Sequence, residues 1–153
     1  MDIVWKYDHA AMRWDRKMRR LGYSKACQQF LPPPIEPMQP VLDVGTGTGL
    51  FADAWLVTGG SRDLTLVDPS QAMLDVARIR FSAASVAVNS FTSKLEDYQP
   101  KRRFHTVLAA HVVEHFEDPV AAMAKIADCL VPNGRLILVV SKPHWCNWLI
   151  CLR

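Results

Sequence analysis

Three glycines at alternate positions join an apolar run to a helical pattern in residues 41–55, VLDVGTGTGLFADAW. The apolar run Val41–Val44 predicts a short buried strand, and the following segment predicts a helix that starts near Gly49. Glycines let the main chain of the turn approach a ligand closely, because no Cβ stands in the way. The feature therefore predicts a strand-turn-helix unit that carries a small molecule with a nucleotide-like half.

The rest of the chain repeats this alternation of apolar runs and helical patterns. Further strands are predicted at residues 64–68, 85–89, 104–110 and 135–140. Helices are predicted after Ser70, a good capping residue, and after Asp118, which is followed by Pro119. The strands are mostly apolar throughout, so both of their faces are expected to be buried. The prediction is an α/β protein with a Rossmann-like, doubly wound, mostly parallel sheet.

Each predicted helix has an apolar stripe that is expected to face the sheet. The stripe after Ser70 consists of Met73, Leu74 and Ala77. The stripe after Asp118 consists of Val120, Met123, Ala124, Ala127 and Leu130. Pro132–Gly134 predicts a turn before the last strand.

Residues 4–21 predict one amphipathic helix. Its apolar stripe consists of Val4, Tyr7, Ala11, Trp14, Met18 and Leu21, and the other positions hold Arg13, Arg16, Lys17, Arg19 and Arg20. The favoured interpretation is that the stripe packs on the main domain and the basic face is solvated. The alternative is a lid, or a docking face for an acidic substrate or a membrane surface. Five prolines in residues 31–40 predict a stiff connector. The expected organisation is a helical arm at 1–30, the connector at 31–40 and a ligand-binding domain at 41–153.

Composition narrows the functional classes. The 153 residues suit one domain, and a net charge of +3 does not by itself imply a nucleic-acid partner. The cysteines Cys27, Cys129, Cys146 and Cys151 form no C-x-x-C pair, which argues against a zinc site and a disulfide framework. A reducing cytoplasm is therefore the expected location. No apolar run is long enough to cross a bilayer, and the first residues lack the apolar core of a signal peptide.

In a sheet of this kind, ligands bind beyond the carboxyl ends of the strands. The predicted cleft is formed by Asp43–Gly49, Asp68, residues 89–94 and Ala110–His115. Asp43 would repel a pyrophosphate and attract a cation, and Leu50 stands where a dinucleotide site has its third glycine. S-adenosylmethionine carries an ammonium and a sulfonium and no phosphate, so it is the favoured ligand. Asp68 is expected to accept hydrogen bonds from ribose hydroxyls, to cap the next helix, or both.

Four segments, VLDVGTGTG, LVDPSQAML, FHTVLAAHVVEHFEDP and LVPNGRLILVV, resemble the class I S-adenosylmethionine-dependent methyltransferases. They are most similar to the type 11 group, which includes the ubiquinone and menaquinone biosynthesis enzymes. The resemblance covers residues 41–141 in the order of the family. It implies a methyltransferase (EC 2.1.1.-) that converts S-adenosylmethionine to S-adenosylhomocysteine.

The resemblance also implies roles for individual residues. The cofactor would be held by Asp43, Gly45, Thr46, Gly47 and Gly49 at its methionine end, by Asp68 at its ribose, and by Pro69, Met73, Ser93, Lys94 and Leu95 near its adenine. Lys94 stands where the family usually has an acid, which Glu96 or Asp97 would supply if the alignment shifts. Ala110 and His111 would border the transferred methyl group. Tyr7 or Trp14 of the arm would cover the cofactor, or both would pack in the helix stripe.

The chemistry of methyl transfer asks mainly for alignment of acceptor, methyl group and sulfur, and for exclusion of water. A hydroxyl acceptor would gain from a base, and His111 is the nearest candidate. His111–His115, HVVEH, also matches the inverted zinc-protease motif, but it directly follows a buried strand and lacks a third ligand. No metal is therefore expected.

The expected partner is a small-molecule acceptor, and no aromatic-and-basic motif indicates nucleic acid. The alternative function is a catalytically inactive cofactor-binding module or subunit, because Lys94 and His105 depart from the family pattern. A nicotinamide-dependent oxidoreductase is disfavoured by Asp43. Family members usually continue with a helix and a hairpin that complete a seven-stranded sheet, so the last two strands are expected to be missing here. The fifth strand would then offer an edge to a second copy or to a tail stripe of Trp145, Trp148, Leu149 and Leu152.

Overall fold

The computed structural model describes residues 3–33 and 39–140, which form one parallel sheet with helices on both faces. The strands are β1 (Val41–Val44), β2 (Leu64–Asp68), β3 (Val88–Thr92), β4 (Phe104–Ala110) and β5 (Leu130–Val139). The helices are α1 (Ile3–Arg20), α2 (Tyr23–Gln28), α3 (Leu50–Val57), α4 (Gln71–Ala83) and α5 (Pro119–Cys129), with a short 3₁₀ turn, η1 (Val113–His115). The predicted α/β class and parallel sheet are confirmed.

The strand order is β3-β2-β1-β4-β5, so the direction of winding reverses between β1 and β4. Val44 at the end of β1 pairs with Val67 of β2 and with Ala109 of β4. The carboxyl ends of the three central strands therefore meet at one edge of the sheet. A crevice at such a reversal point is where open parallel sheets bind ligands.

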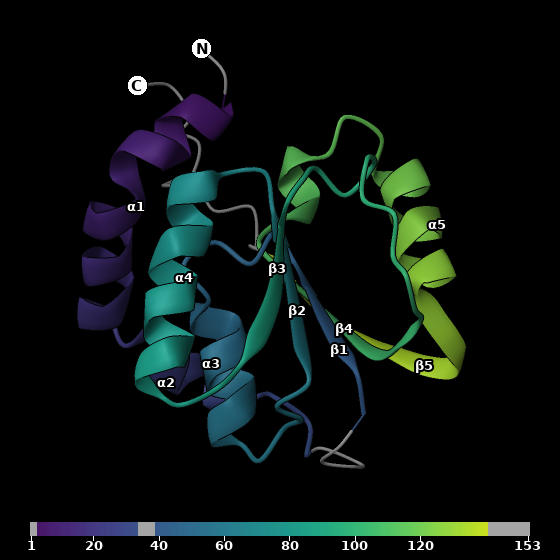
Figure 1. Ribbon diagram of the computed structural model, residues 1–153, viewed down its shortest axis with the longest axis horizontal. Helices are drawn as coiled ribbons and strands as arrows, with labels where there is room; N and C mark the ends of the chain where they lie inside the picture. Colours follow the sequence, from purple (N-terminus) through teal and green to yellow (C-terminus); the bar gives the residue numbers. More distant parts are fainter. Residues whose placement is uncertain (1–2, 34–38, 141–153) are drawn as a thin grey trace.

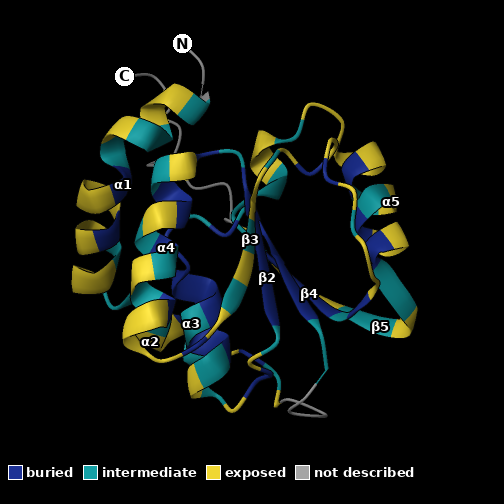
Figure 2. Ribbon diagram, viewed as in Figure 1, coloured by how far each residue is buried: buried dark blue, intermediate teal, exposed yellow. Residues whose placement is uncertain are grey.

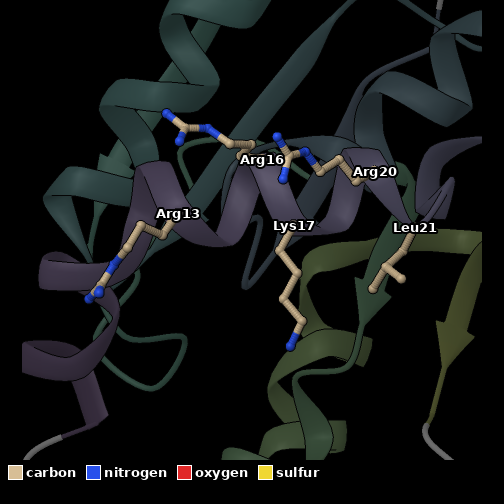
Figure 3. A pocket seen from close by; sticks show the side chains of 5 residues that line it. All are labelled: Arg13, Arg16, Lys17, Arg20 and Leu21. Carbon is tan, nitrogen blue, oxygen red and sulfur yellow. The ribbon is translucent and has the colours of Figure 1, made fainter.

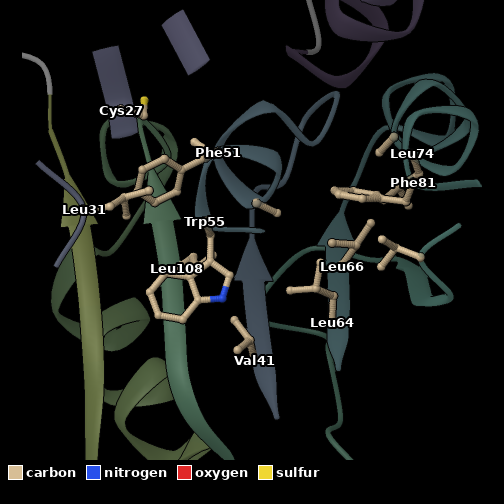
Figure 4. Packing of buried hydrophobic residues seen from close by; sticks show 14 residues of the cluster. Cys27, Leu31, Val41, Phe51, Trp55, Leu64, Leu66, Leu74, Phe81 and Leu108 are labelled. Carbon is tan, nitrogen blue, oxygen red and sulfur yellow. The ribbon is translucent and has the colours of Figure 1, made fainter. Parts of the chain in front are cut away.

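The sheet is covered unequally on its two faces (Figure 1). One face carries α2, α3 and α4, and α1 lies outside them against α4; the other face carries α5. Figure 4 shows the larger core, in which Trp55 of α3 and Phe81 of α4 pack over Leu66 and Leu108 of the sheet. None of the described helices is long and apolar enough to cross a membrane.

Burial is complete only in the middle of the sheet (Figure 2). Every residue of β1 and β2 is buried, and most of β4 is buried as well. The expectation that all strands are buried on both faces is wrong for β3 and β5, which alternate between half-buried and exposed residues. Both are edge strands of the described sheet, so each has a neighbouring strand on one side only.

The third strand lies three residues later than predicted. It spans Val88–Thr92 rather than 85–89, and its pairing with β2 begins at Val88 opposite Leu64. Ser85 has a φ of 55°, and the main-chain N–H of Val86 donates to the carbonyl of Phe81 at 2.8 Å. These residues therefore form the exit from α4 and are not available to pair with β2.

The region around α5 differs from prediction in two ways. The buried residues of α5 are Ala122, Ile126 and Cys129, whereas Val120 of the predicted stripe is 80% exposed. Ala124 and Ala127 of the predicted stripe are exposed as well, so the helix faces the sheet with the second of its two overlapping apolar stripes. Pro132–Gly134 is also part of β5, which pairs with β4 through a register shift between Phe104 and Thr106.

The buried face of α1 differs from the predicted apolar stripe. Ala11 and Asp15 are buried in α1, whereas Trp14 and Leu21 of the predicted stripe are 39% and 69% exposed. A second helix, α2, follows Gly22 and was not predicted, because six residues are too few for a periodic pattern. Residues 34–38 of the proline-rich connector and the whole tail stripe (Trp145, Trp148, Leu149 and Leu152) lie outside the described residues.

Candidate functional site

The glycine turn connects β1 to α3 at the reversal point of the sheet. Its main-chain N–H groups at Gly45 and Thr46 donate to the carbonyl of Val67 at 2.8 and 3.2 Å. Gly45 and Gly49 have positive φ values of 62° and 79°. A Cβ at Gly45 would lie 2.4 Å from Val112, and one at Gly49 would lie 2.8 Å from Phe81. These two glycines are therefore required by the close packing of the turn as well as by its conformation.

Gly47 is different, because none of the described residues occupies the space beside it. Its φ is 53°, and an added Cβ would meet no heavy atom of residues 3–33 and 39–140 within 4 Å. Packing therefore does not explain this glycine. The turn therefore leaves open space beside Gly47, its middle residue, and a side chain at this position would project into that space, which we call the cradle.

Asp43 lies in the strand directly before the turn and is almost completely buried. The hydroxyl of Thr46 donates a hydrogen bond to its carboxylate. Burial raises the pKa of Asp43 to about 7, the hydrogen bond from Thr46 opposes this shift, and the charge of Asp68 adds to it. A buried carboxylate with such a pKa is stabilised in its charged form by a cation bound next to it.

Asp68 ends β2 and connects the glycine turn to α4. One of its carboxylate oxygens accepts from the N–H of Gly47 at 2.8 Å, and the other accepts from the N–H of Ser70 at 2.8 Å. Burial raises the pKa of Asp68, and these two main-chain bonds oppose the shift. Ser70 in turn caps α4 by accepting from the N–H of Met73. Asp68 thus shapes the helix start and the turn, and each of its oxygens keeps a further lone pair for another donor.

The loop after β4 lies next to the glycine turn. His111 has a φ of 54°, and its N–H donates to the carbonyl of Val139 at 2.8 Å. Its Nδ1 lies 3.9 Å from a carboxylate oxygen of Glu114. Val112 packs against Gly45. The loop therefore touches both the glycine turn and β5.

Two tyrosines of the arm reach this loop. The hydroxyl of Tyr7 lies 3.2 Å from Nε2 of His115, and the ring of Tyr23 lies 5.7 Å from the ring of His111. Burial raises the pKa of both phenols, and the charge of Glu114 adds to both shifts. Trp14 packs edge-on against Tyr7 at 6.1 Å. Tyr7 therefore packs against Trp14 within the arm and also contacts the loop after β4, and its covering of a cofactor stays a prediction.

The remaining predicted site residues lie around the same crevice in different states of burial. The N–H of Ser93 donates to the carbonyl of Asp68 at 3.1 Å, which holds the end of β3 next to β2. Lys94 is exposed, whereas Leu95 and Met73 are 3% and 2% exposed and fill the interior. Pro69 and Ala110 are half-buried.

The structure also shows where His105, Glu96, Asp97 and the two histidines of the HVVEH segment lie. His105 is near the amino end of β4, where its N–H donates to the carbonyl of Pro40, so it faces the opposite edge of the sheet. Glu96 and Asp97 are exposed. His111 and His115 do not share an α-helix, because only the 3₁₀ turn η1 forms there. Across residues 3–33 and 39–140, no group of three or more His, Cys, Asp or Glu side chains is placed to hold a metal ion.

Three functional contacts were missed from the sequence. Arg80 of α4 donates from Nε to the carbonyl of Thr48 at 2.9 Å, and its other end is paired with Asp15 of α1. Asp8 of α1 accepts from the hydroxyl of Ser70 at 2.5 Å. The available signal was the seven-residue spacing of Asp8 and Asp15, which places both on one face of the arm helix.

Comparison with known proteins gives the family of this arrangement. A family model described as "Methyltransferase domain" matches residues 41–134, which is more than half of the chain. A ubiquinone biosynthesis O-methyltransferase of Bradyrhizobium diazoefficiens is 30% identical over 112 residues, covering 73% of this chain and 44% of the relative. The chain spans about half the length of the curated relatives it matches.

Solved structures share the fold. A structure of a putative S-adenosyl-L-methionine-dependent methyltransferase from Methanococcus maripaludis has a TM-score of 0.73 at 14% identity, and the match covers 86% of this chain and 62% of that one. Coclaurine N-methyltransferase, solved with N-methylheliamine and S-adenosylhomocysteine, has a TM-score of 0.60 at 20% identity, covering 68% of this chain and 31% of that one.

Proposed function

Because the chain belongs to the class I S-adenosylmethionine-dependent methyltransferase family, we propose that its glycine turn binds S-adenosylmethionine and that the protein transfers the methyl group to a small-molecule acceptor. The cofactor, when bound, supplies a methyl group activated by a positively charged sulfur. The relatives' names include O- and N-methyltransferases, so phenols and amines are the first acceptors to screen.

One observation carries the proposal: the glycine turn is flanked by two buried carboxylates and leaves an open cradle at Gly47. A pyrophosphate on the turn would bring negative charge next to Asp43, whereas an ammonium there is complementary to it. Asp68 can accept hydrogen bonds from the ribose of either kind of ligand, so the choice between them rests on Asp43. The residues present therefore fit the cofactor of the family.

The roles follow from position in the crevice. Asp43 stabilises the ammonium at the methionine end, and Gly45, Thr46, Gly47 and Gly49 supply a main chain without interfering side chains. Asp68 uses its remaining lone pairs for the ribose hydroxyls. Ser93 and Lys94 would lie next to the adenine. Met73, Leu95 and Pro69 would form the apolar surface against which the adenine packs.

The acceptor side is formed by the loop after β4 and by the arm. Ala110 and His111 border the methyl group. Tyr7 and Tyr23 of the arm contact the loop after β4 and exclude water from the acceptor side of the site. His111 is half-exposed and near Glu114, which orients it as the candidate base for a hydroxyl acceptor. Replacing it by alanine should lower methyl transfer to a phenol by a larger factor than it lowers cofactor affinity.

Calorimetric titration of the chain with S-adenosylhomocysteine, and separately with NADH, tests the proposal. Micromolar binding of S-adenosylhomocysteine alone is the expected result. Binding of NADH with similar affinity would favour an oxidoreductase and contradict the proposal. Binding of S-adenosylhomocysteine without methyl transfer to any phenol or amine would favour the alternative, an inactive cofactor-binding module.

A further inference from the structure

The outer face of α1 concentrates positive charge. The helix contains six Lys and Arg residues and two Asp residues, while the whole chain has a net charge of only +3. Both aspartates are used on the inner side, where Asp8 accepts from Ser70 and Asp15 pairs with Arg80. The exposed cations are Lys6, Arg13, Arg16, Lys17, Arg19 and Arg20. Of these cations, Arg19 also lies 4.0 Å from Asp15, which it shares with Arg80, so the two aspartates of the helix leave most of its outward charge unneutralised.

The outer face of α1 does not form a pocket that could enclose a small ligand. Arg13, Arg16, Lys17, Arg20 and Leu21 line a shallow hollow whose walls come from this one segment (Figure 3). The side chains project from the helix in different directions, as Figure 3 shows. Small ligands are bound in concave pockets that bury most of their surface. A row of exposed cations along one side of a helix is better matched by an extended anionic surface.

Large apolar side chains border the basic face on both sides. Trp5 and Met12 are 51% and 63% exposed and lie seven residues apart along one border. Trp14 and Leu21 are 39% and 69% exposed and have the same spacing along the other border. Tryptophan and aliphatic residues beside cations are typical of helices that lie in a membrane-water interface.

We propose that the outer face of α1 docks the protein on an anionic lipid surface, with the helix lying parallel to it. The cations would meet lipid phosphates, and the apolar borders would insert between headgroups. A nucleic acid also presents phosphates, but its backbone offers no complementary partner for Met12 and Leu21. This inference goes beyond the proposed function and does not depend on catalysis.

Vesicle sedimentation of the full chain tests the proposal, with phosphatidylcholine vesicles and with phosphatidylcholine–phosphatidylglycerol vesicles. Binding is expected only to the mixed vesicles, and it should weaken as salt is raised. The double variant Arg16→Gln/Arg20→Gln should reduce the partition coefficient about thirty-fold. The control Lys101→Gln/Arg103→Gln removes the same charge from exposed residues of another surface loop and should change binding little.

The apolar borders need their own variant. Met12→Gln/Leu21→Gln keeps every charge and should remove the part of the binding that survives high salt. Equal binding to neutral and anionic vesicles, or an equal loss in both charge variants, would overturn the proposal. So would binding of a duplex oligonucleotide that depends on Arg16 and Arg20 while the vesicles remain unbound. Circular dichroism of each variant checks that the fold is retained.

Discussion

Arg80 holds the carbonyl of Thr48, the residue between the second and third glycines of the turn, through a hydrogen bond of 2.9 Å from its Nε. The same guanidinium is paired with Asp15 of the arm. Both side chains of the pair are nearly buried, at 13% and 12% exposed. The arm and the proposed cofactor turn are therefore connected through one side chain of α4.

Replacing Arg80 with lysine should separate the two ends of this connection. A lysine keeps a charge for Asp15 but has one terminal donor group and cannot also reproduce the fixed guanidinium fork. We expect S-adenosylhomocysteine affinity to fall by about tenfold, or about 1.4 kcal/mol, with a smaller change in stability. Calorimetric titration measures this loss. Arg78→Lys on the same helix is the control, and an equal loss there would show that the contact to Thr48 is irrelevant.

Replacing Asp15 with asparagine should act mainly on stability. The change leaves the guanidinium of Arg80 largely buried without its counter-charge. Breaking a buried pair from one side costs about 3–5 kcal/mol, and the remaining exposure of this pair favours the lower end. Urea unfolding followed by circular dichroism gives the value. Asp75→Asn, which breaks an exposed pair with Arg78, should cost less than about 1 kcal/mol; comparable costs would refute the argument.

The three glycines of the turn should respond differently to alanine. Gly45→Ala and Gly49→Ala would force a Cβ against Val112 and Phe81, so both should lower the unfolding free energy strongly. The Cβ of Gly47→Ala meets no atom in the described part of the chain, so this change should cost only the left-handed backbone penalty of about 1–2 kcal/mol. Its cofactor affinity should nevertheless fall most relative to its stability, because the new methyl group projects into the proposed cradle. A Gly47→Ala protein that binds S-adenosylhomocysteine normally would place the ligand elsewhere.

Asp43 should make cofactor binding depend on pH. Its carboxyl has a pKa of about 7 in the folded chain, against an ordinary value of 3.8. Only the ionised form complements an ammonium, so affinity should fall by about tenfold per pH unit below pH 7. Titrations between pH 5.5 and about 8 test this expectation. Asp43→Asn should bind weakly at every pH, whereas Asp128→Asn on α5 should keep the pH dependence.

The raised pKa of Asp43 should make stability depend on pH in the opposite direction to cofactor affinity. Between the ordinary pKa and about pH 7 the folded carboxyl keeps a proton that the unfolded chain releases. The contribution of Asp43 to the unfolding free energy therefore decreases as pH rises through this window and levels off above it. Asp43→Asn should remove this component and be at least as stable as the parent at pH 8. Urea unfolding at several pH values follows it, and a variant much less stable than the parent at pH 8 would refute a buried charge at this position.

Local signals in the sequence predicted the central elements well. The bounds of β1, β2 and β4 agree with prediction, because these strands are mostly buried apolar runs. The Ser70 and Asp118 caps are also confirmed, since each side chain accepts from the main chain of its own helix. Edge strands and helix phase were less predictable. The start of β3 depends on how α4 ends, and the buried side of α5 depends on which stripe meets the sheet.

The candidate site also has residues that were predictable from the sequence and residues that were not. The carboxylates and glycines of one crevice were predictable because parallel strands bring their carboxyl ends together. The contribution of Tyr23 was not, because α2 gives no periodic signal and its ring reaches His111 only through the tertiary fold. The pairing of Asp15 with Arg80 was not predictable for a similar reason. Asp15 lies among arginines of its own helix, and only packing against α4 brings Arg80 next to it.

The central claim is that the turn between β1 and α3 holds the methionine end of the cofactor. Mapping amide chemical shifts of ¹⁵N-labelled protein during titration with S-adenosylhomocysteine tests it most directly. The largest changes should fall on Gly45, Gly47 and Gly49, with further changes at Asp68 and His111. Saturable changes confined to other parts of the chain would contradict the claim.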